Sequence, residues 1–256
     1  MREAGALAAS TFRKEYKSWT KQGGSPVTEA DIAVDLLLRE RLTRLIPDVG
    51  WLSEESEDDR ARLGGSRLWI VDPIDGTRAY VNGRTDWAIS VALVENGRPL
   101  VGAIFAPMED GLYLGLAGEG ATREGVPLRA NDSDTLDRAR TAGPKPMLAE
   151  LAKSQPGIVL EPKVHSLALR LARIAAGRLD IAFASKDSHD WDLAAADLIV
   201  HEAGGALSTL EGQTPVYNSA HARHGALVAA GRARHQHLIA ITREWRPRGV
   251  LHDSLA

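Results

Sequence analysis

The chain has 256 residues, of which 25% are charged and 44% hydrophobic, a balance typical of a folded globular protein rather than a disordered one. Its formal net charge of −3 gives no overall basic field for nucleic acid or an anionic membrane surface. The lack of cysteine excludes disulfides, thiolate metal sites and a cysteine nucleophile. Because no apolar run reaches membrane-span length and no signal-peptide pattern is present, we expect a cytoplasmic protein.

The N-terminal half of the sequence predicts two helices followed by antiparallel strands. Helices are expected at about residues 2–14 and 28–47, the second because apolar residues recur at helical spacing and Thr28 and Asp31 match a capping box. An Asn-Gly turn at Asn96-Gly97 predicts a hairpin. The expected strands are 49–53, 68–71, 87–94, 100–105 and 112–116. This antiparallel run argues against a simple alternating βαβ fold.

The C-terminal half alternates helices and strands after an interrupted stretch. Over residues 131–162, prolines and polar residues interrupt any helical or strand-like spacing of apolar residues, which predicts an irregular connection. We therefore expect a single domain over 1–256, with an N-terminal lobe at about 1–130 and a C-terminal lobe at about 131–256. The helices expected after the connection are 166–176, 191–203 and 234–242, and the strands are 179–184, 206–209 and 226–230.

The most informative stretch is Asp72-Pro73-Ile74-Asp75-Gly76-Thr77, directly after an apolar run. One interpretation is a plain turn, because Pro and Asp-Gly are common turn formers. The other is a cation site, since two carboxylates three residues apart can converge on one ion if the chain curls back. An oxygen-rich cluster in a chain without cysteine favours magnesium over zinc. Backbone N–H groups at the start of a following helix would then suit a phosphate.

Three other acidic positions have both a structural and a functional interpretation. Glu54-Glu55 has the composition of a solvated loop, but it lies at the end of a predicted strand. Asp31 fits a helix capping box, and Asp192 stands at a predicted helix start, where an acid normally acts as a cap. The residues alone leave both interpretations open.

In chain order, these segments resemble the inositol monophosphatase family, the lithium-sensitive, magnesium-dependent phosphomonoesterases. The family pattern runs as an Asp, Glu-Glu, D-P-[IL]-D-[GS]-T, and W-D followed by eleven residues and G-G. The matching segments here are Asp31, Glu54-Glu55, Asp72 to Thr77, Trp191-Asp192 and Gly204-Gly205. The resemblance implies the family's layered αβαβα fold, of mixed α/β class, and a homodimer.

The resemblance also implies a role for each matched position. The metal ligands would be Glu54, Asp72, Asp75, Asp192 and the carbonyl of Ile74, holding two or three Mg²⁺ ions. The catalytic residues would be Asp31, Thr77 and Glu54, and Thr77 with Asp31 would help to deprotonate the attacking water. The backbone N–H groups of Gly76 and Thr77 would receive the phosphate of a small substrate.

Departures from the family pattern concern mainly the substrate. Family members that hydrolyse inositol monophosphate often have a Glu where this chain has Ser185, which is followed by Lys186. His165-Ser166 replaces a common Gly-Ser, and Ser53 replaces a frequent glycine. The lost acceptor and the added cation at the substrate-binding positions Ser185 and Lys186 favour a more anionic substrate.

Two substrates and one non-enzymatic function stay open at this point. The substrates are inositol monophosphate and 3′-phosphoadenosine 5′-phosphate, the second being the substrate of a 3′(2′),5′-bisphosphate nucleotidase. The alternative function is that of a non-catalytic or moonlighting scaffold in a transcription complex. Neither a membrane nor nucleic acid is expected as a partner.

Overall fold

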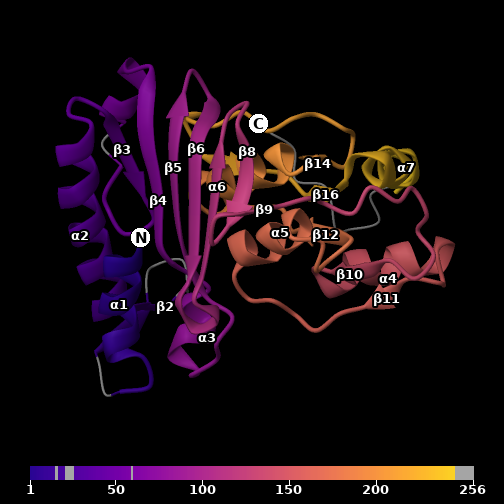
Figure 1. The fold of residues 1–256 in the computed structure, drawn as a ribbon, viewed down its shortest axis with the longest axis horizontal. Coiled ribbons are helices and arrows are strands. Elements are labelled where there is room, and N and C mark those ends of the chain that lie inside the picture. The colour runs from indigo at the N-terminus through magenta and orange to yellow at the C-terminus, as the bar shows by residue number, and fades with distance from the viewer. Residues whose placement is uncertain (15–16, 21–25, 59, 246–256) are drawn as a thin grey trace.

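Two β-sheets, with helices between them and on both outer sides, make up the structure (Figure 1). The computed structural model describes residues 1–14, 17–20, 26–58 and 60–245. Separate apolar clusters fill the space between successive layers, and the largest lies between the two sheets. The expected layered αβαβα sandwich is confirmed.

The larger sheet has seven strands, in the order β3-β4-β5-β6-β7-β8-β9. Their bounds are β3 (Gly50–Ser53), β4 (Arg67–Asp75), β5 (Ala88–Glu95), β6 (Arg98–Ala106), β7 (Gly111–Leu116), β8 (Gly120–Arg123) and β9 (Val126–Pro127). Within this sheet, as far as the structure describes the chain, β3 and β4 pair in parallel and all other neighbouring strands pair antiparallel. The predicted hairpin turn joins β5 and β6, and Asn96 and Gly97 both have positive φ angles, as an Asn-Gly turn requires.

The smaller sheet has five strands, in the order β11-β10-β12-β16-β14. Their bounds are β11 (Val159–Leu160), β10 (Arg140–Ala142), β12 (Ile181–Ala184), β16 (Leu227–Gly231) and β14 (Gly205–Thr209). Two short ribbons pair β1 (Ser18–Thr20) with β2 (Pro26–Thr28) and β13 (Ser188–His189) with β15 (Arg223–His224).

The expectation of an irregular connection over residues 131–162 is wrong, because this stretch contains β10, β11 and the helix α4 (Lys145–Ser154). Pro144 is the N-cap of α4, so a proline that interrupts the pattern in fact starts the helix. Met147 and Leu151 are buried one turn apart in the outer apolar cluster. The proposed division into two lobes near residue 130 stays a prediction.

Most of the remaining helices occupy the three helical layers. The remaining helices are α1 (Arg2–Thr11), α2 (Glu29–Leu45), α3 (Thr77–Val81), α5 (Leu167–Ala175), α6 (Asp190–Glu202) and α7 (Arg232–Thr242), with short 3₁₀ turns η1 (Ala61–Gly64) and η2 (Pro107–Glu109). Helices α1 and α2 cover one face of the larger sheet, α5 and α6 lie between the sheets, and α4 and α7 cover the outer face of the smaller sheet (Figure 1). Helix α3, by contrast, lies at one end of the larger sheet (Figure 1). Among the described helices, none is long and apolar enough to cross a membrane.

Close contact between α6 and the larger sheet fixes the position of the helix that carries Asp192. A Cβ atom at Gly102 of β6 would lie 2.6 Å from the carbonyl oxygen of Ala195 in α6, so only glycine permits this approach. Ala194 and Ala196 of the same helix are fully buried. The start of α6 is therefore held against the sheet from which the other carboxylates project.

Candidate active site

An irregularity in β4 allows Asp72 and Asp75 to point toward the same space. Residues three apart on a regular strand point to opposite faces of a sheet. Asp72 pairs with Ser90 and Asp75 with Ala88, so β4 has one extra residue relative to β5, as in a β-bulge. The expectation that the strand covers only 68–71 is therefore wrong, because the strand continues through the motif to Asp75.

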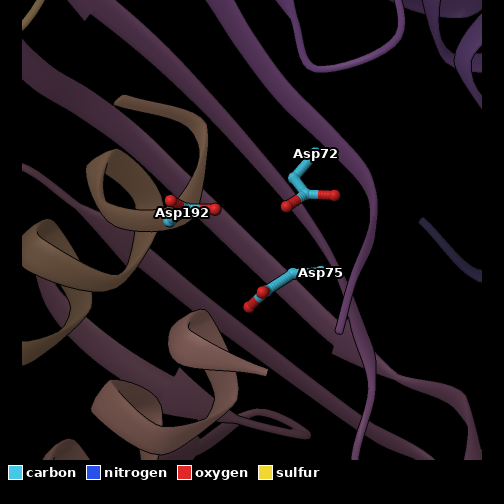
Figure 2. A group of neighbouring side chains, drawn as sticks. All are labelled: Asp72, Asp75 and Asp192. Atoms are coloured by element: carbon cyan, nitrogen blue, oxygen red, sulfur yellow. The ribbon is translucent and has the colours of Figure 1, made fainter. Parts of the chain in front are cut away.

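The start of α6 brings Asp192 to these two carboxylates. Asp192 is the third residue of α6, and its Oδ2 accepts the backbone N–H of His189 at 2.7 Å, which confirms the predicted capping role. Carboxylate oxygens of Asp72, Asp75 and Asp192 lie within 4.8 Å of one another (Figure 2). Asp192 thus both caps a helix and completes an acidic cluster.

Burial and mutual repulsion raise the pKa values of all three carboxyl groups. Burial raises the pKa of Asp72 well above its usual range, and the charges of Glu54 and Asp75 raise it further. Burial raises the pKa of Asp75 to about 6, although hydrogen bonds from α5 oppose the shift. Burial, followed by the charge of Asp75, raises the pKa of Asp192. Without a cation, the cluster therefore opposes its own ionisation.

The N-terminus of α5 holds Asp75 in a fixed orientation. The hydroxyl of Ser166 and the backbone N–H of Ala168 both donate to Asp75 Oδ2, at 2.6 Å each. Ser166 is also the N-cap of α5, since its Oγ accepts the N–H of Leu169 at 2.9 Å. The serine of the His165-Ser166 departure thus positions one of the acidic residues.

The acidic cluster has the chemistry that a hard divalent cation needs. Asp72 is 1% exposed, and its Oδ2 has no hydrogen-bond partner among the described residues. Such a buried carboxylate oxygen is costly unless a cation satisfies it. Glu54 follows β3, its backbone N–H donates to the carbonyl of Val71 in β4, and its charge acts on the pKa of all three aspartates. The residues present therefore fit a divalent cation with oxygen ligands.

Asp31 and Thr77 meet beside the cluster, as the resemblance implies. The Thr77 hydroxyl lies 3.3 Å from Asp31 Oδ1 and 3.0 Å from the Ile74 carbonyl, and it can donate its proton to either. Asp31 Oδ2 accepts the backbone N–H of Thr28 at 2.8 Å and its hydroxyl at 2.6 Å, within the capping box predicted from the sequence. Gly76, with φ +94°, is the N-cap of α3, so a helix does begin at Thr77.

An open hollow of about 870 Å³ extends from Asp75 and Asp192. Ser185 lines this hollow, whereas Lys186 is exposed on the same turn and is not among the lining residues. The wall includes cationic residues that the sequence analysis missed, namely Arg78, Lys145, Lys163 and Arg170. They are scattered in the sequence, and only Arg78, beside Thr77, lies close to a recognisable motif.

A buried network around Asp35, also missed in the sequence, supports the Glu54-Glu55 segment. The hydroxyls of Ser53 and Ser56 donate to the two carboxylate oxygens of Asp35 at 2.5 and 2.7 Å. Ser53 Oγ also accepts the backbone N–H of Glu55 at 3.3 Å. Ser53, which departs from the family pattern, therefore links α2 to this segment.

We expect Asp35→Ala to destabilise the protein and weaken cation binding at the acidic cluster. The loss of two charge-assisted hydrogen bonds should lower the free energy of unfolding by about 2 kcal/mol, and a less ordered Glu54 should raise the apparent Kd for a divalent cation such as Mg²⁺ several-fold. Urea unfolding and a Mg²⁺ titration measure the two effects, with the exposed Asp134→Ala as control. Unchanged values in both measurements would contradict a supporting role for Asp35.

The fold and the acidic cluster define a metal-dependent enzyme built as an αβαβα sandwich, and comparisons with known proteins specify its family. The inositol monophosphatase family model matches residues 1–246. The chain therefore belongs to the inositol monophosphatase family, and it is a phosphatase that acts on phosphoric monoesters.

Individual relatives cover most of the chain but differ in the substrates that their names give. The chain is 36% identical over 220 residues to a histidinol-phosphatase of Mycobacterium tuberculosis, covering 81% of this chain and 84% of the relative. It is 30% identical over 223 residues to an inositol-1-monophosphatase of Bacillus subtilis, covering 83% of each. It is 29% identical over 225 residues to the 3′(2′),5′-bisphosphate nucleotidase CysQ of Aggregatibacter actinomycetemcomitans, covering 84% of each.

A solved structure shows the same fold. The structure of an IMPase from Thermotoga maritima superposes with a TM-score of 0.82 at 26% identity, covering 95% of this chain and 94% of the other. The expected family and fold are thus confirmed.

Proposed function

We propose that this protein is a magnesium-dependent phosphatase that removes phosphate from a small phosphorylated substrate at the acidic cluster. The convergence of Asp72, Asp75 and Asp192 within 4.8 Å carries this proposal. Magnesium fits best, because carboxylate and carbonyl oxygens are its preferred protein ligands and neither sulfur nor imidazole belongs to the cluster. The proposed ligands are Glu54, Asp72, Asp75, Asp192 and the Ile74 carbonyl, for two or three ions.

Each residue of the site has a proposed task. Bound Mg²⁺ would neutralise phosphate charge and make an attacking water more acidic. The Thr77 hydroxyl, whose own proton is directed to Ile74 and Asp31, can accept a hydrogen bond from that water and orient it. Asp31 and Glu54 supply negative charge that favours loss of the water's proton. The backbone N–H groups of Gly76 and Thr77 are proposed to hold phosphate oxygens.

The substrate, the assembly and the location remain part of this proposal. The named relatives act on inositol monophosphate, histidinol phosphate or a nucleoside bisphosphate, according to their names. Ser185, which replaces an acceptor carboxylate and lines the hollow, supports a substrate other than inositol monophosphate. Inhibition by lithium and a homodimer are inferred from the family resemblance, and a cytoplasmic location is inferred from the sequence pattern.

A substrate panel with and without Mg²⁺ tests the proposed function. We expect phosphate release from inositol monophosphate, histidinol phosphate or 3′-phosphoadenosine 5′-phosphate only when Mg²⁺ is present, with kcat/KM ranking the substrates and lithium as an inhibition control. Phosphate release that persists in excess EDTA would contradict the metal requirement. Failure on the whole panel would refute the proposed substrates.

A further inference from the structure

Three cationic side chains on the wall of the hollow have no anionic partner in the part of the chain that the structure describes. Arg78 lies in α3, Lys145 is the first residue of α4, and Lys163 lies between β11 and α5. All three are exposed, and among the described residues no ion pair or hydrogen bond involves their side chains. We call these three residues the cationic wall. Because Asp75 and Asp192 line the same hollow, the cationic wall and the acidic cluster face one space.

The position of Lys145 is unfavourable for the helix that it begins. The N-terminus of a helix carries partial positive charge, so acidic residues stabilise it and cations destabilise it. α4 has ten residues, no side-chain cap and no acidic residue in its first turn. By contrast, the first turns of α2 and α6 each contain two acidic residues. An anion bound in the hollow would offset the repulsion at the start of α4.

The other charged residues of the hollow leave the cationic wall available. Arg170 is buried, and its guanidinium already donates to the carbonyls of Val164 and Phe183. The His165 ring contacts Asp86, at 2.7 Å from Nδ1 to Oδ2. Glu161 and Asp187 are the acidic residues of the hollow besides the cluster. Their oxygens suit hydroxyl or amino groups of a substrate, and the three cations outnumber them.

We propose that the cationic wall binds a second phosphate of the substrate while the first phosphate lies at the acidic cluster. The substrate class is therefore a bisphosphate, with one phosphate removed and the other used for recognition. This inference rests on the proposed function. A volume of about 870 Å³ is in the range of sites that hold ligands of nucleotide size. Both nucleoside and sugar bisphosphates have this chemistry, and the cationic wall disfavours a cationic substrate such as histidinol phosphate.

Matched pairs of substrates isolate the contribution of the second phosphate. One pair is adenosine 3′,5′-bisphosphate with adenosine 3′-monophosphate, and the other is fructose 1,6-bisphosphate with fructose 1-phosphate. In at least one pair, we expect kcat/KM to be about tenfold or more higher for the bisphosphate. The pair that shows the preference identifies the organic part. Equal kcat/KM values within both pairs would overturn the inference.

The double variant Lys145→Ala/Lys163→Ala tests whether the lysines of the cationic wall bind the second phosphate. We expect it to lose about tenfold or more in kcat/KM for the preferred bisphosphate, mainly through KM, and less than about threefold for the matching monophosphate. Lys145→Arg/Lys163→Arg should keep the preference. The control Lys14→Ala/Lys153→Ala removes two exposed charges outside the hollow and should also keep it.

The outcomes separate this inference from the proposed function. If Lys145→Ala/Lys163→Ala keeps the preference for the bisphosphate, or if Lys14→Ala/Lys153→Ala loses it, the role assigned to the cationic wall is refuted. The proposed phosphatase function would not be affected by either result. The absence of Mg²⁺-dependent phosphate release from all four substrates and from the panel above would overturn the proposed function, and this inference with it. A thermal melt checks folding, which alanine at the start of α4 should not impair.

Discussion

Asp192→Asn and Asp75→Asn are each expected to reduce phosphate release by roughly 10³-fold or more. Asparagine has the shape of aspartate but lacks its charge, so the acidic cluster would lose a ligand that neutralises a divalent cation. The fold should tolerate both changes. An amide oxygen at position 192 can still accept the N–H of His189, and one at position 75 can still accept from Ser166 and Ala168.

The measurement is kcat/KM at several Mg²⁺ concentrations, together with a thermal melt of each variant. Asp134→Asn serves as a control, because it removes one exposed acidic charge outside the cluster. A folded Asp192→Asn protein with activity close to that of the parent would refute the assignment of this residue. A scaffold function in a transcription complex would not need these carboxylates, so binding to a transcription complex that persists in both variants would show such a function beside catalysis.

Local sequence signals predicted the parts of the fold that local interactions determine. Thr28 and Asp31 form the expected capping box, and Asn96-Gly97 forms the expected hairpin turn. Both features depend on contacts between residues close in the chain, which spacing in the sequence reveals. The capping position of Asp192 was predictable for the same reason.

Features that depend on distant contacts were not predictable from spacing. The bulge in β4 exists only relative to the neighbouring strand, so Asp72-Pro73 appeared to end the strand that it in fact continues. Helix α4 is stabilised by burial against the smaller sheet and α7, and the prolines at its start concealed its short apolar pattern in the sequence. The bond from Ser53 to Asp35, and the hollow that Asp75 and Lys145 both line, likewise depend on segments distant in the sequence. The family pattern located the acidic cluster because it combines residues from four such segments.

The three carboxyl groups of the cluster should make the metal-free protein less stable as the pH rises. A carboxyl group with a raised pKa binds its proton more tightly in the folded than in the unfolded protein, so its ionisation favours unfolding. For Asp75, with a pKa of about 6 against an ordinary value of 3.8, this cost grows from about pH 4 to above pH 6 and reaches about 3 kcal/mol. The raised pKa values of Asp72 and Asp192 act in the same direction.

Asp75→Asn should therefore raise the Tm of the metal-free protein at pH 7.5, although we expect it to reduce activity strongly. The difference in Tm between this variant and the parent should shrink as the pH falls to 5, because the parent carboxyl is then protonated. Burial lowers the pKa of His189 and His235, so these groups also change the stability with pH. Because they do so in both proteins, the difference in Tm between the variant and the parent isolates the effect of Asp75. Saturating Mg²⁺ should reverse the order by stabilising the parent more than the variant. A lower Tm for Asp75→Asn at pH 7.5 in EDTA would show that the hydrogen bonds from Ser166 and Ala168 to the carboxylate outweigh the repulsion within the cluster.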